Sequence, residues 1–208
     1  MIVLFAVVLA AYVLGSVSGS LLMGRFRGVD IRTQGSGNAG GTNALRTQGW
    51  RFALGVVVVD VGKGVLAVWL AQRVFPADVA VAFGALYAAV IGHIWPVFHE
   101  FRGGKGAATL VGGLLLVWPQ ALLPLLGVWL LCLLLTGYVG LSTVLAAASL
   151  VFSAAGFGMP PVYWVFAAVG AVLLAYSHRS NLQRLRDGTE SRFEKARLLG
   201  RLLTGRRG

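Results

Sequence analysis

The chain has 208 residues, of which 57% are hydrophobic and only 12% are charged, and its formal net charge is +11. This composition, with a mean hydropathy of +0.79, predicts an integral membrane protein and excludes a soluble globular domain. Positive charge in a membrane protein usually belongs to cytoplasmic loops, so it does not indicate a nucleic-acid partner. The lone Cys132 excludes a disulfide framework and a cysteine-based metal site.

Apolar stretches predict an all-α membrane protein with seven transmembrane helices. The first, residues 2–23, has no basic residue before it and two arginines directly after it, which favours a retained helix over a cleaved signal peptide. The stretch 107–135 is interrupted by Trp118-Pro119-Gln120, and each half is short for a bilayer core about 30 Å thick, so we expect two short central helices. The other predicted spans are 52–72, 79–98, 144–157 and 162–177, with turns at 73–78, 137–143 and 158–161.

Seven crossings from an outside N-terminus place three segments and the C-terminus on one side of the membrane. These segments, 24–51, 99–106 and 178–208, contain five, two and nine of the 18 Lys and Arg residues. The positive-inside rule therefore predicts that this side is cytoplasmic.

The predicted organisation is a single membrane domain, residues 1–178, followed by a basic cytoplasmic tail, residues 179–208. Within the tail, residues 191–203 mix basic and apolar side chains. This mixture predicts an amphipathic helix that lies on the anionic inner leaflet.

Three polar clusters interrupt the apolar sequence, and the predicted topology brings them to the same cytoplasmic surface. The first is RTQGSGNAGGTNALR at 32–46, where glycines let backbone N–H groups approach a ligand and the side chains supply phosphate donors. The second is RGGKG at 102–106, at the start of a helix, where the dipole and Lys105 favour an anion. The third is HRSN at 178–181, at the inner end of the last span, and it continues to Glu190.

Asp60 and Lys63 are charged residues inside the second span, three apart and so on one helix face. Because intramembrane charges are costly unless paired, they form either a structural pair or a polar element beside the active site.

Several common motifs are absent. The glycines at 35, 37 and 40 match GxGxxG but follow a membrane helix, and GGKG lacks the Ser or Thr of a P-loop. There is no GxSxG elbow, and the three histidines have no metal-ligand spacing, so we expect no metal and no cofactor. The His-x4-Asp pattern of acyl-CoA-dependent glycerolipid acyltransferases is also missing.

The three segments GSGNAGGTNALR, GHIWPVFHEFRGGKGAAT and HRSNLQRLRDGTE resemble the three motifs of the bacterial acyl-phosphate:glycerol-3-phosphate acyltransferases, the PlsY family. Their order and spacing match, and the resemblance covers essentially the whole chain. It implies transfer of a fatty acyl group from acyl phosphate to the 1-hydroxyl of glycerol 3-phosphate, giving lysophosphatidate and phosphate in phospholipid biosynthesis. It also implies a multi-pass protein of the bacterial inner membrane with its active site facing the cytoplasm.

The resemblance implies a set of site residues at matching positions. The expected catalytic residues are Ser36, Arg46, Lys105, His178 and Asn181. The expected substrate-binding residues are Gly37, Asn38, Thr42, Asn43, Gly103, Gly104 and Ser142. The expected partners are acyl phosphate, glycerol 3-phosphate, membrane lipid and an upstream enzyme that produces acyl phosphate.

The acceptor hydroxyl must lose a proton, and we expect no carboxylate within the core of the three clusters to take it. His178 is the only side chain there whose type titrates near neutrality, so a general-base role is one hypothesis. The other is substrate-assisted catalysis, in which the donor phosphate accepts the proton while His178 and Asn181 hold the acceptor. Arg179 and a cation-rich site favour neutral imidazole, which suits a base and a hydrogen-bond donor equally well. We favour the second hypothesis, because the donor carries phosphate oxygens beside the reacting carbonyl and a phosphate can accept a proton.

Two other classes of function are open to a chain of this kind. The first is a transporter or channel for an anionic solute, although the sequence has no repeated half and no continuous polar path. The second is a membrane scaffold, which would not need so many phosphate donors.

Overall fold

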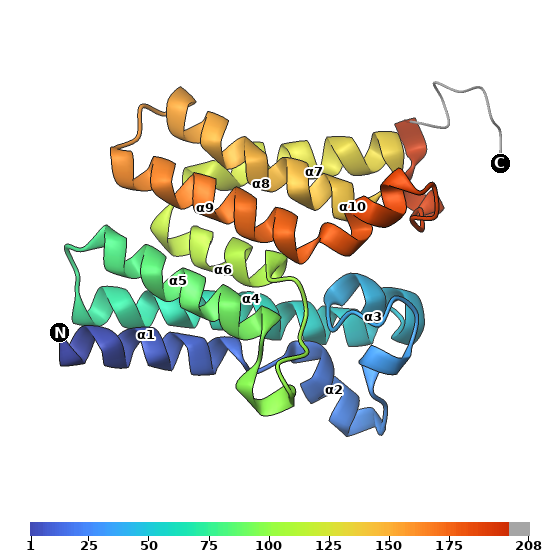
Figure 1. Ribbon diagram of the computed structural model, residues 1–208, viewed down its shortest axis with the longest axis horizontal. Helices are drawn as coiled ribbons and strands as arrows, with labels where there is room; N and C mark the ends of the chain where they lie inside the picture. The colour runs from blue at the N-terminus through green and yellow to red at the C-terminus, as the bar shows by residue number, and fades with distance from the viewer. Residues whose placement is uncertain (200–208) are drawn as a thin grey trace. The chain divides into compact units, whose positions relative to one another are not determined.

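The computed structural model describes residues 1–199, and these residues form helices, turns and loops with no strand (Figure 1). Their contacts separate the chain into two compact units, one ending at Pro119 and one beginning at Gln120. The all-helical class is thus confirmed. The predicted division into a membrane domain and a tail at residue 178 stays a prediction.

The first unit contains six α-helices and two short 3-10 helices among the described residues. The α-helices are α1 (Ile2–Gly15), α2 (Gly19–Arg27), α3 (Gly41–Gln48), α4 (Trp50–Val74), α5 (Val79–Ile94) and α6 (Ala107–Val117). The 3-10 helices are η1 (Ile31–Thr33) and η2 (Val97–His99).

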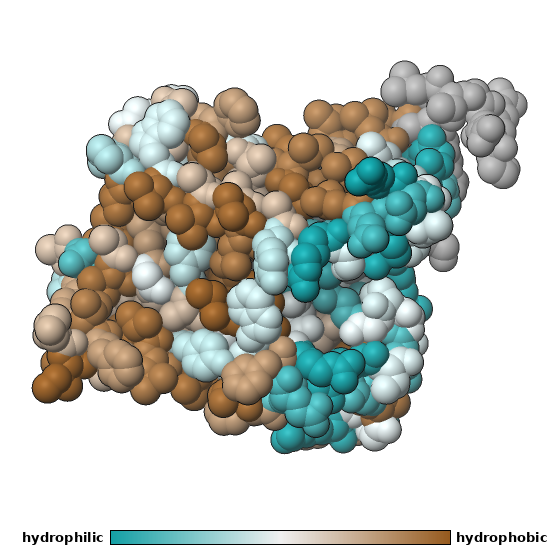
Figure 2. All heavy atoms as spheres, in the orientation of Figure 1, coloured by the Kyte–Doolittle hydropathy of each residue, from teal (hydrophilic) through white to brown (hydrophobic). Residues whose placement is uncertain are grey.

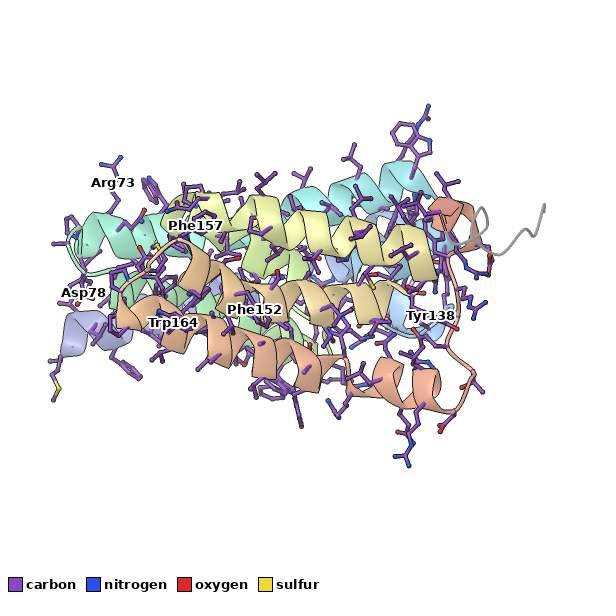
Figure 3. All side chains as sticks on the ribbon, turned by 90° about the horizontal axis from the view of Figure 1, so that it is seen from above. Arg73, Asp78, Tyr138, Phe152, Phe157 and Trp164 are labelled. Carbon is purple, nitrogen blue, oxygen red and sulfur yellow. The ribbon has the colours of Figure 1, made fainter. Side chains whose placement is uncertain are left out.

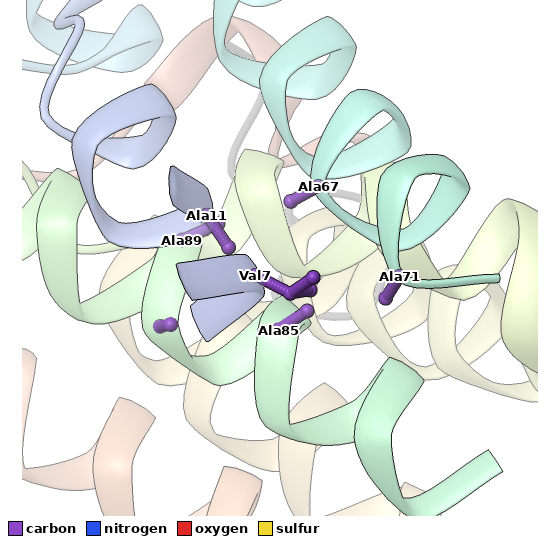
Figure 4. Close-up of a cluster of buried hydrophobic side chains, with 7 residues drawn as sticks. Val7, Ala11, Ala67, Ala71, Ala85 and Ala89 are labelled. Carbon is purple, nitrogen blue, oxygen red and sulfur yellow. The ribbon is translucent and has the colours of Figure 1, made fainter. Parts of the chain in front are cut away.

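Small residues let the helices of the first unit approach closely. Val7 and Ala11 of α1 pack with alanines of α4 and α5 in a buried cluster (Figure 4). A Cβ on Gly15 would overlap the backbone of Ala89, and a Cβ on Gly64 would overlap the backbone of Thr109. Such contacts are typical of membrane helices, where close van der Waals packing replaces the hydrophobic drive available in water.

Up to residue 199, the second unit contains four α-helices and a 3-10 turn, and another 3-10 turn (η3, Pro119–Ala121) spans the boundary between the units. The α-helices are α7 (Leu122–Thr136), α8 (Val139–Gly156), α9 (Pro161–Ser177) and α10 (Arg179–Arg186), followed by η4 (Glu194–Ala196). Gly158, with φ of +59°, makes the turn between α8 and α9. Trp164 at the start of α9 donates from Nε1 to the Met159 carbonyl at 3.1 Å and so closes this turn (Figure 3).

The surfaces of both units suit a lipid environment. In the first unit, apolar side chains cover most of the visible face of α1 and α5, whereas polar ones gather over α2 (Figure 2). In the second unit α9 is mostly apolar and α10 is polar (Figure 2). Among residues 1–199, four helices are long and apolar enough to cross a membrane, and up to six spans result if each bent helix pair is one crossing. α6 is a shorter apolar helix.

Most predicted boundaries agree with the structure to within a few residues. The predicted break at 118–120 separates α6 from α7, and the predicted turn at 73–78 corresponds to a turn at 75–78. Asp78 ends this turn because its Oδ1 accepts from the N–H groups of Ala80 and Val81, which caps α5 (Figure 3).

The structure departs from the prediction in five details. The first span is two helices, α1 and α2, bent by 41° at residues 16–18. The predicted loop at 32–46 contains most of α3, which starts after its N-cap Gly40. The many glycines of this segment had favoured a loop over a helix. α8 starts at Val139, so Ser142 and Thr143 are helical, and the last span ends in a separate helix, α10, bent by 61° from α9. Residues 191–197 form a loop with one 3-10 turn where an amphipathic helix was predicted, residues 198–199 are helical, and residues 200–203 of that prediction lie outside the described residues.

Candidate active site

Asn43, on α3, organises the first polar cluster. Its Oδ1 accepts from the Ser36 N–H at 3.0 Å, and its Nδ2 lies 2.9–3.1 Å from the carbonyls of Gln34, Ile31 and Asn38. The side chain is only 2% exposed. Asn43 was expected to contact substrate. In the structure its side-chain amide hydrogen-bonds to the loop backbone and holds the loop in place.

Two glycines of this loop have conformations that other residues avoid. Gly35 has φ of +56° and Gly37 has φ of +70°. A Cβ on Gly35 would also overlap Oδ1 of Asn43. The two glycines let the chain wrap around the Asn43 side chain and leave Ser36 exposed at the tip of the loop.

An ion pair fixes the entry to the loop. Arg32 donates from Nη2 to Asp30 Oδ2 at 2.8 Å and from Nε to the same carboxylate at 3.1 Å. These hydrogen bonds lower the pKa of Asp30 and raise the pKa of Arg32, and partial burial opposes both shifts. Arg32 also donates from Nη1 to the His99 carbonyl at 3.3 Å, so the pair joins this loop to the second cluster.

The second cluster lies against the first. The Gly103 and Gly104 N–H groups donate to the carbonyls of Ile94 and His93 at 3.2 and 3.0 Å, which folds the loop back on the end of α5. A Cβ on Gly104 would overlap both Nε2 of His93 and the carbonyl of Ala39, so only glycine fits. Ala39 belongs to the first loop. The structure therefore brings together the expected site residues of both clusters within the first unit.

The remaining expected residues of the first unit are on α3 and at the start of α6. Thr42 and Arg46 are four apart on α3 and share one face of that helix. Arg46 is exposed, whereas Lys105 is half-buried directly before Gly106, the N-cap of α6. A loop rich in N–H donors, an exposed hydroxyl and two cations can bind a phosphate group.

In the second unit, His178 is oriented by its own helix. Its Nδ1 lies 2.8 Å from the Leu174 carbonyl and 3.2 Å from Ser177 Oγ. A carbonyl only accepts, so Nδ1 carries the proton in this bond. In the neutral ring Nε2 is then an acceptor. This finding corrects the expectation that neutral His178 serves equally well as base and as hydrogen-bond donor.

Asn181 is held by a carboxylate. Its Nδ2 donates to Glu190 Oε1 at 2.6 Å, and Arg184 Nε donates to Glu190 Oε2 at 2.7 Å. The Asn181 side chain also packs on Gly140, where a Cβ would lie 2.7 Å from that of Asn181. The Glu190 carboxylate thus orients the amide of Asn181.

Ser142 lies on α8 in the second unit and is fully buried. Its Oγ donates to the Tyr138 carbonyl at 2.8 Å, a bond within its own helix. The hydroxyl oxygen keeps its acceptor capacity, so substrate binding by Ser142 stays a prediction.

Sequence reasoning missed three groups that shape the candidate site. Glu190 was placed at the edge of the third cluster, and a carboxylate in direct contact with Asn181 was not expected. Arg184, which the sequence analysis gave no role, is the ion-pair partner of Glu190. The link from His93 to Gly104 was also missed. Gly188, which has φ of +71° between Arg184 and Glu190, is the sequence signal that could have indicated a turn there.

Comparison with known proteins identifies the family. The family model described as "Glycerol-3-phosphate acyltransferase" matches residues 5–188. The chain belongs to this family. A glycerol-3-phosphate acyltransferase of Chlorobaculum tepidum is 34% identical over 230 residues, covering 95% of this chain and 99% of the relative. "Glycerol-3-phosphate acyltransferase 2" of Moorella thermoacetica is 43% identical over 184 residues, covering 88% of this chain and 94% of the relative.

Solved structures of the acyltransferase family agree with this placement. A crystal structure of PlsY (YgiH), an integral membrane glycerol 3-phosphate acyltransferase in its glycerol 3-phosphate form, is 35% identical and has a TM-score of 0.86. The match covers 98% of this chain and 99% of that one. The lysophosphatidic acid form of PlsY matches with the same identity and TM-score over 94% of this chain. The expected family is confirmed, and the chain is a multi-pass membrane acyltransferase.

Proposed function

We propose that the protein transfers a fatty acyl group from acyl phosphate to the 1-hydroxyl of glycerol 3-phosphate, forming 1-acylglycerol 3-phosphate and inorganic phosphate. The observation that carries this proposal is the family match, which extends from residue 5 to residue 188 and includes all three motifs. The acceptor and product follow from structures of a relative bound to glycerol 3-phosphate and to lysophosphatidic acid. The absent His-x4-Asp pattern supports acyl phosphate, in place of acyl-CoA, as the donor.

The first two motifs supply phosphate recognition in this proposal. Lys105 and Arg46 provide positive charge, and Ser36, Asn38 and Thr42 provide hydrogen-bonding groups beside the loop backbone. Gly37, Gly103 and Gly104 bring backbone N–H groups close to the ligand. Asn43 contributes indirectly, because its amide holds the loop that presents these groups.

The third motif handles the acceptor hydroxyl. His178 and Asn181 hold the acceptor in this proposal, and Leu174 and Glu190 orient the two side chains through His178 Nδ1 and Asn181 Nδ2. Two polar side chains suit the hydroxyl groups of a glycerol backbone, and Ser142 is a third polar group in this unit. These side chains orient the 1-hydroxyl for attack.

The reaction requires no covalent enzyme intermediate. The 1-hydroxyl oxygen forms a bond to the acyl carbon, and the bond from that carbon to the phosphate oxygen breaks. The hydroxyl proton passes to a phosphate oxygen of the donor, so phosphate leaves as the protonated anion. Cations of the first unit stabilise the charge that develops on this leaving group.

The proposed topology has seven crossings, an outside N-terminus and a cytoplasmic active site in the bacterial inner membrane. The four long apolar spans already include α7, the two bent pairs bring the number to six, and the seventh crossing is the short α6. The lipid-facing exposed side chains and the basic residues of the three motif segments support this arrangement. The acyl phosphate would be drawn from the lipid or handed over by the enzyme that produces it.

An activity assay separates this function from anion transport. Purified protein in phospholipid bicelles, given acyl phosphate and glycerol 3-phosphate, should form lysophosphatidate and phosphate in a one-to-one ratio. The same protein in sealed vesicles should not move glycerol 3-phosphate across the bilayer. Transport without product formation would favour the anion transporter instead.

Cysteine labelling tests the topology. In a Cys132→Ser background, Asp187→Cys and Ala77→Cys place single thiols at two exposed positions, after α10 and in the α4–α5 turn. In intact spheroplasts a membrane-impermeant maleimide should label position 77 and leave position 187 unlabelled until the cells are lysed. The reverse pattern would overturn the proposed orientation.

A further inference from the structure

Three polar side chains of the first unit form a buried network that the reaction scheme does not use. Asp60 and Lys63 of α4 and His93 of α5 are 1%, 4% and 3% exposed. The Lys63 ammonium reaches Asp60 Oδ1 at 3.0 Å, the Val17 carbonyl at 2.9 Å and His93 Nδ1 at 2.6 Å. Its three N–H donors therefore have three acceptors.

Both charged groups orient the ring of the histidine. Nδ1 of His93 lies 2.6 Å from the Lys63 ammonium and 3.4 Å from Asp60 Oδ1, so this edge of the ring faces the ion pair and Nε2 lies on the opposite side. Nε2 is the atom that a Cβ on Gly104 would overlap. Gly104, the residue before Lys105, therefore packs directly against the imidazole ring. Its N–H also donates to the His93 carbonyl at 3.0 Å.

The other end of the network holds the break between α1 and α2. Asp60 Oδ1 accepts from the Gly19 N–H at 3.1 Å, and Lys63 donates to the Val17 carbonyl. These backbone groups lie where the helix is interrupted at residues 16–18. The network connects this break, through α4 and α5, to the loop that carries Lys105.

Stability alone does not explain a buried charged set of this kind. Replacing a buried ion pair by groups of similar volume is often neutral for stability, whereas removing one partner is costly. A packing role would be met as well by apolar side chains. The specific advantage of the polar set is that directional bonds set the position of the ring that touches Gly104.

We propose that Asp60, Lys63 and His93 are positioning residues that set the place of Lys105 relative to the first motif, and thereby set affinity for a substrate phosphate. Gly104 is in contact with Ala39 of that motif as well as with His93, so a shift of the ring moves both loops. The inference rests on the proposed phosphate-binding role of Lys105.

The test is a double-mutant cycle between His93 and Lys105 with both substrates. Lys105→Ala first shows which substrate loses affinity, as the larger rise in KM. His93→Asn keeps an acceptor where Nδ1 was, so Lys63 stays satisfied, but it removes the ring edge against Gly104. We expect His93→Asn to raise the KM for that same substrate about tenfold, within the range of coupling energies for residues in contact. Its kcat and melting temperature should stay near those of the wild type.

The double variant decides between positioning and general packing. If His93 acts through Lys105, the combination His93→Asn with Lys105→Ala should have the KM of Lys105→Ala alone. Additive effects, or equal losses for both substrates with a lower melting temperature, would overturn the inference and leave the phosphate role of Lys105 standing. A Lys105→Ala enzyme with wild-type KM values for both substrates would reject the role of Lys105, and this inference with it, while acyltransferase activity itself remained measurable.

A second variant covers the case in which His93→Asn does not fold. Asp60→Asn with Lys63→Gln removes both buried charges together and leaves hydrogen-bonding groups in their place. The same substrate-selective rise in KM, again absent in the Lys105→Ala background, is expected. Unchanged KM values in this folded variant would overturn the inference.

Discussion

The first and third motifs use their polar side chains in opposite ways. In the first, the buried amide of Asn43 is given to backbone groups of its own loop, and the groups presented outward are N–H donors and cations. In the third motif, the polar side chains bond to one another: the Glu190 carboxylate accepts from Asn181 and from Arg184. The first arrangement suits a phosphate, which accepts hydrogen bonds, and the second suits a hydroxyl, which donates one.

This comparison predicts that damage to the first motif acts through the fold of the loop. Asn43→Asp keeps Oδ1 as an acceptor for Ser36 but turns a carboxylate oxygen toward three carbonyls. Each buried group left unsatisfied costs about 1–3 kcal/mol, so we expect loss of activity and a clear fall in melting temperature. Thr33→Ala, at an exposed position of the same segment, should leave both unchanged. A stable, active Asn43→Asp enzyme would show that the loop does not depend on this amide.

Removing a cation should act on binding with little effect on the fold. Lys105→Ala and Arg46→Ala each remove a charge-assisted contact, which costs about 1.5–3 kcal/mol, or roughly ten- to a hundredfold in kcat/KM. Arg51→Ala removes an exposed arginine at the start of α4 and is the control. Wild-type turnover in a folded Lys105 or Arg46 variant would remove that residue from the site.

The third motif should instead lose rate through misorientation of one side chain. Glu190→Ala frees the amide of Asn181 and should lower kcat about tenfold, the effect of losing one hydrogen bond to a charged group. Arg184→Ala touches Asn181 only through Glu190, so its effect should be smaller and should vanish in the Glu190→Ala background. Steady-state kinetics of the three variants measure this coupling. Independent, additive losses would mean that Arg184 has a separate role.

The same contrast explains which parts of the molecule could be predicted from the sequence. Long apolar stretches and the 118–120 break indicated the helices, because hydrophobicity alone decides those. The glycines around α3 concealed that helix, since it is stabilised by tertiary contacts such as those of Asn43 and not by local propensity. The matching motifs selected Asn181, but its orientation by Glu190 depends on a turn at Gly188 that brings residues nine apart together.

His178 tests whether the third motif accepts a proton or only a hydrogen bond. Glutamine at this position places an acceptor near that of Nε2 but cannot take up a proton at neutral pH. We expect His178→Gln to keep an appreciable rate, reduced about tenfold, with the pH–rate profile unchanged between about pH 6 and 7. If turnover vanished while both substrates still bound normally, the histidine would be the base and the phosphate-assisted route would fail.

The smallest expected effect concerns the ion pair at the entry to the first motif. Hydrogen bonds from Arg32 lower the pKa of Asp30 below its ordinary value of 3.8. A group with a lowered folded-state pKa stabilises the protein above the unfolded-state value, and this contribution is lost as the pH falls through the folded-state pKa. The Asp30 side chain is 39% exposed, so the pair contributes at most about 1 kcal/mol.

The Asp30→Asn variant should therefore melt slightly below the wild type at neutral pH, and the difference in melting temperature should shrink steadily below about pH 4. A difference that stayed constant to low pH would show that the asparagine disturbs the N-cap hydrogen bond to the Arg32 N–H, and that the charge of Asp30 contributes nothing.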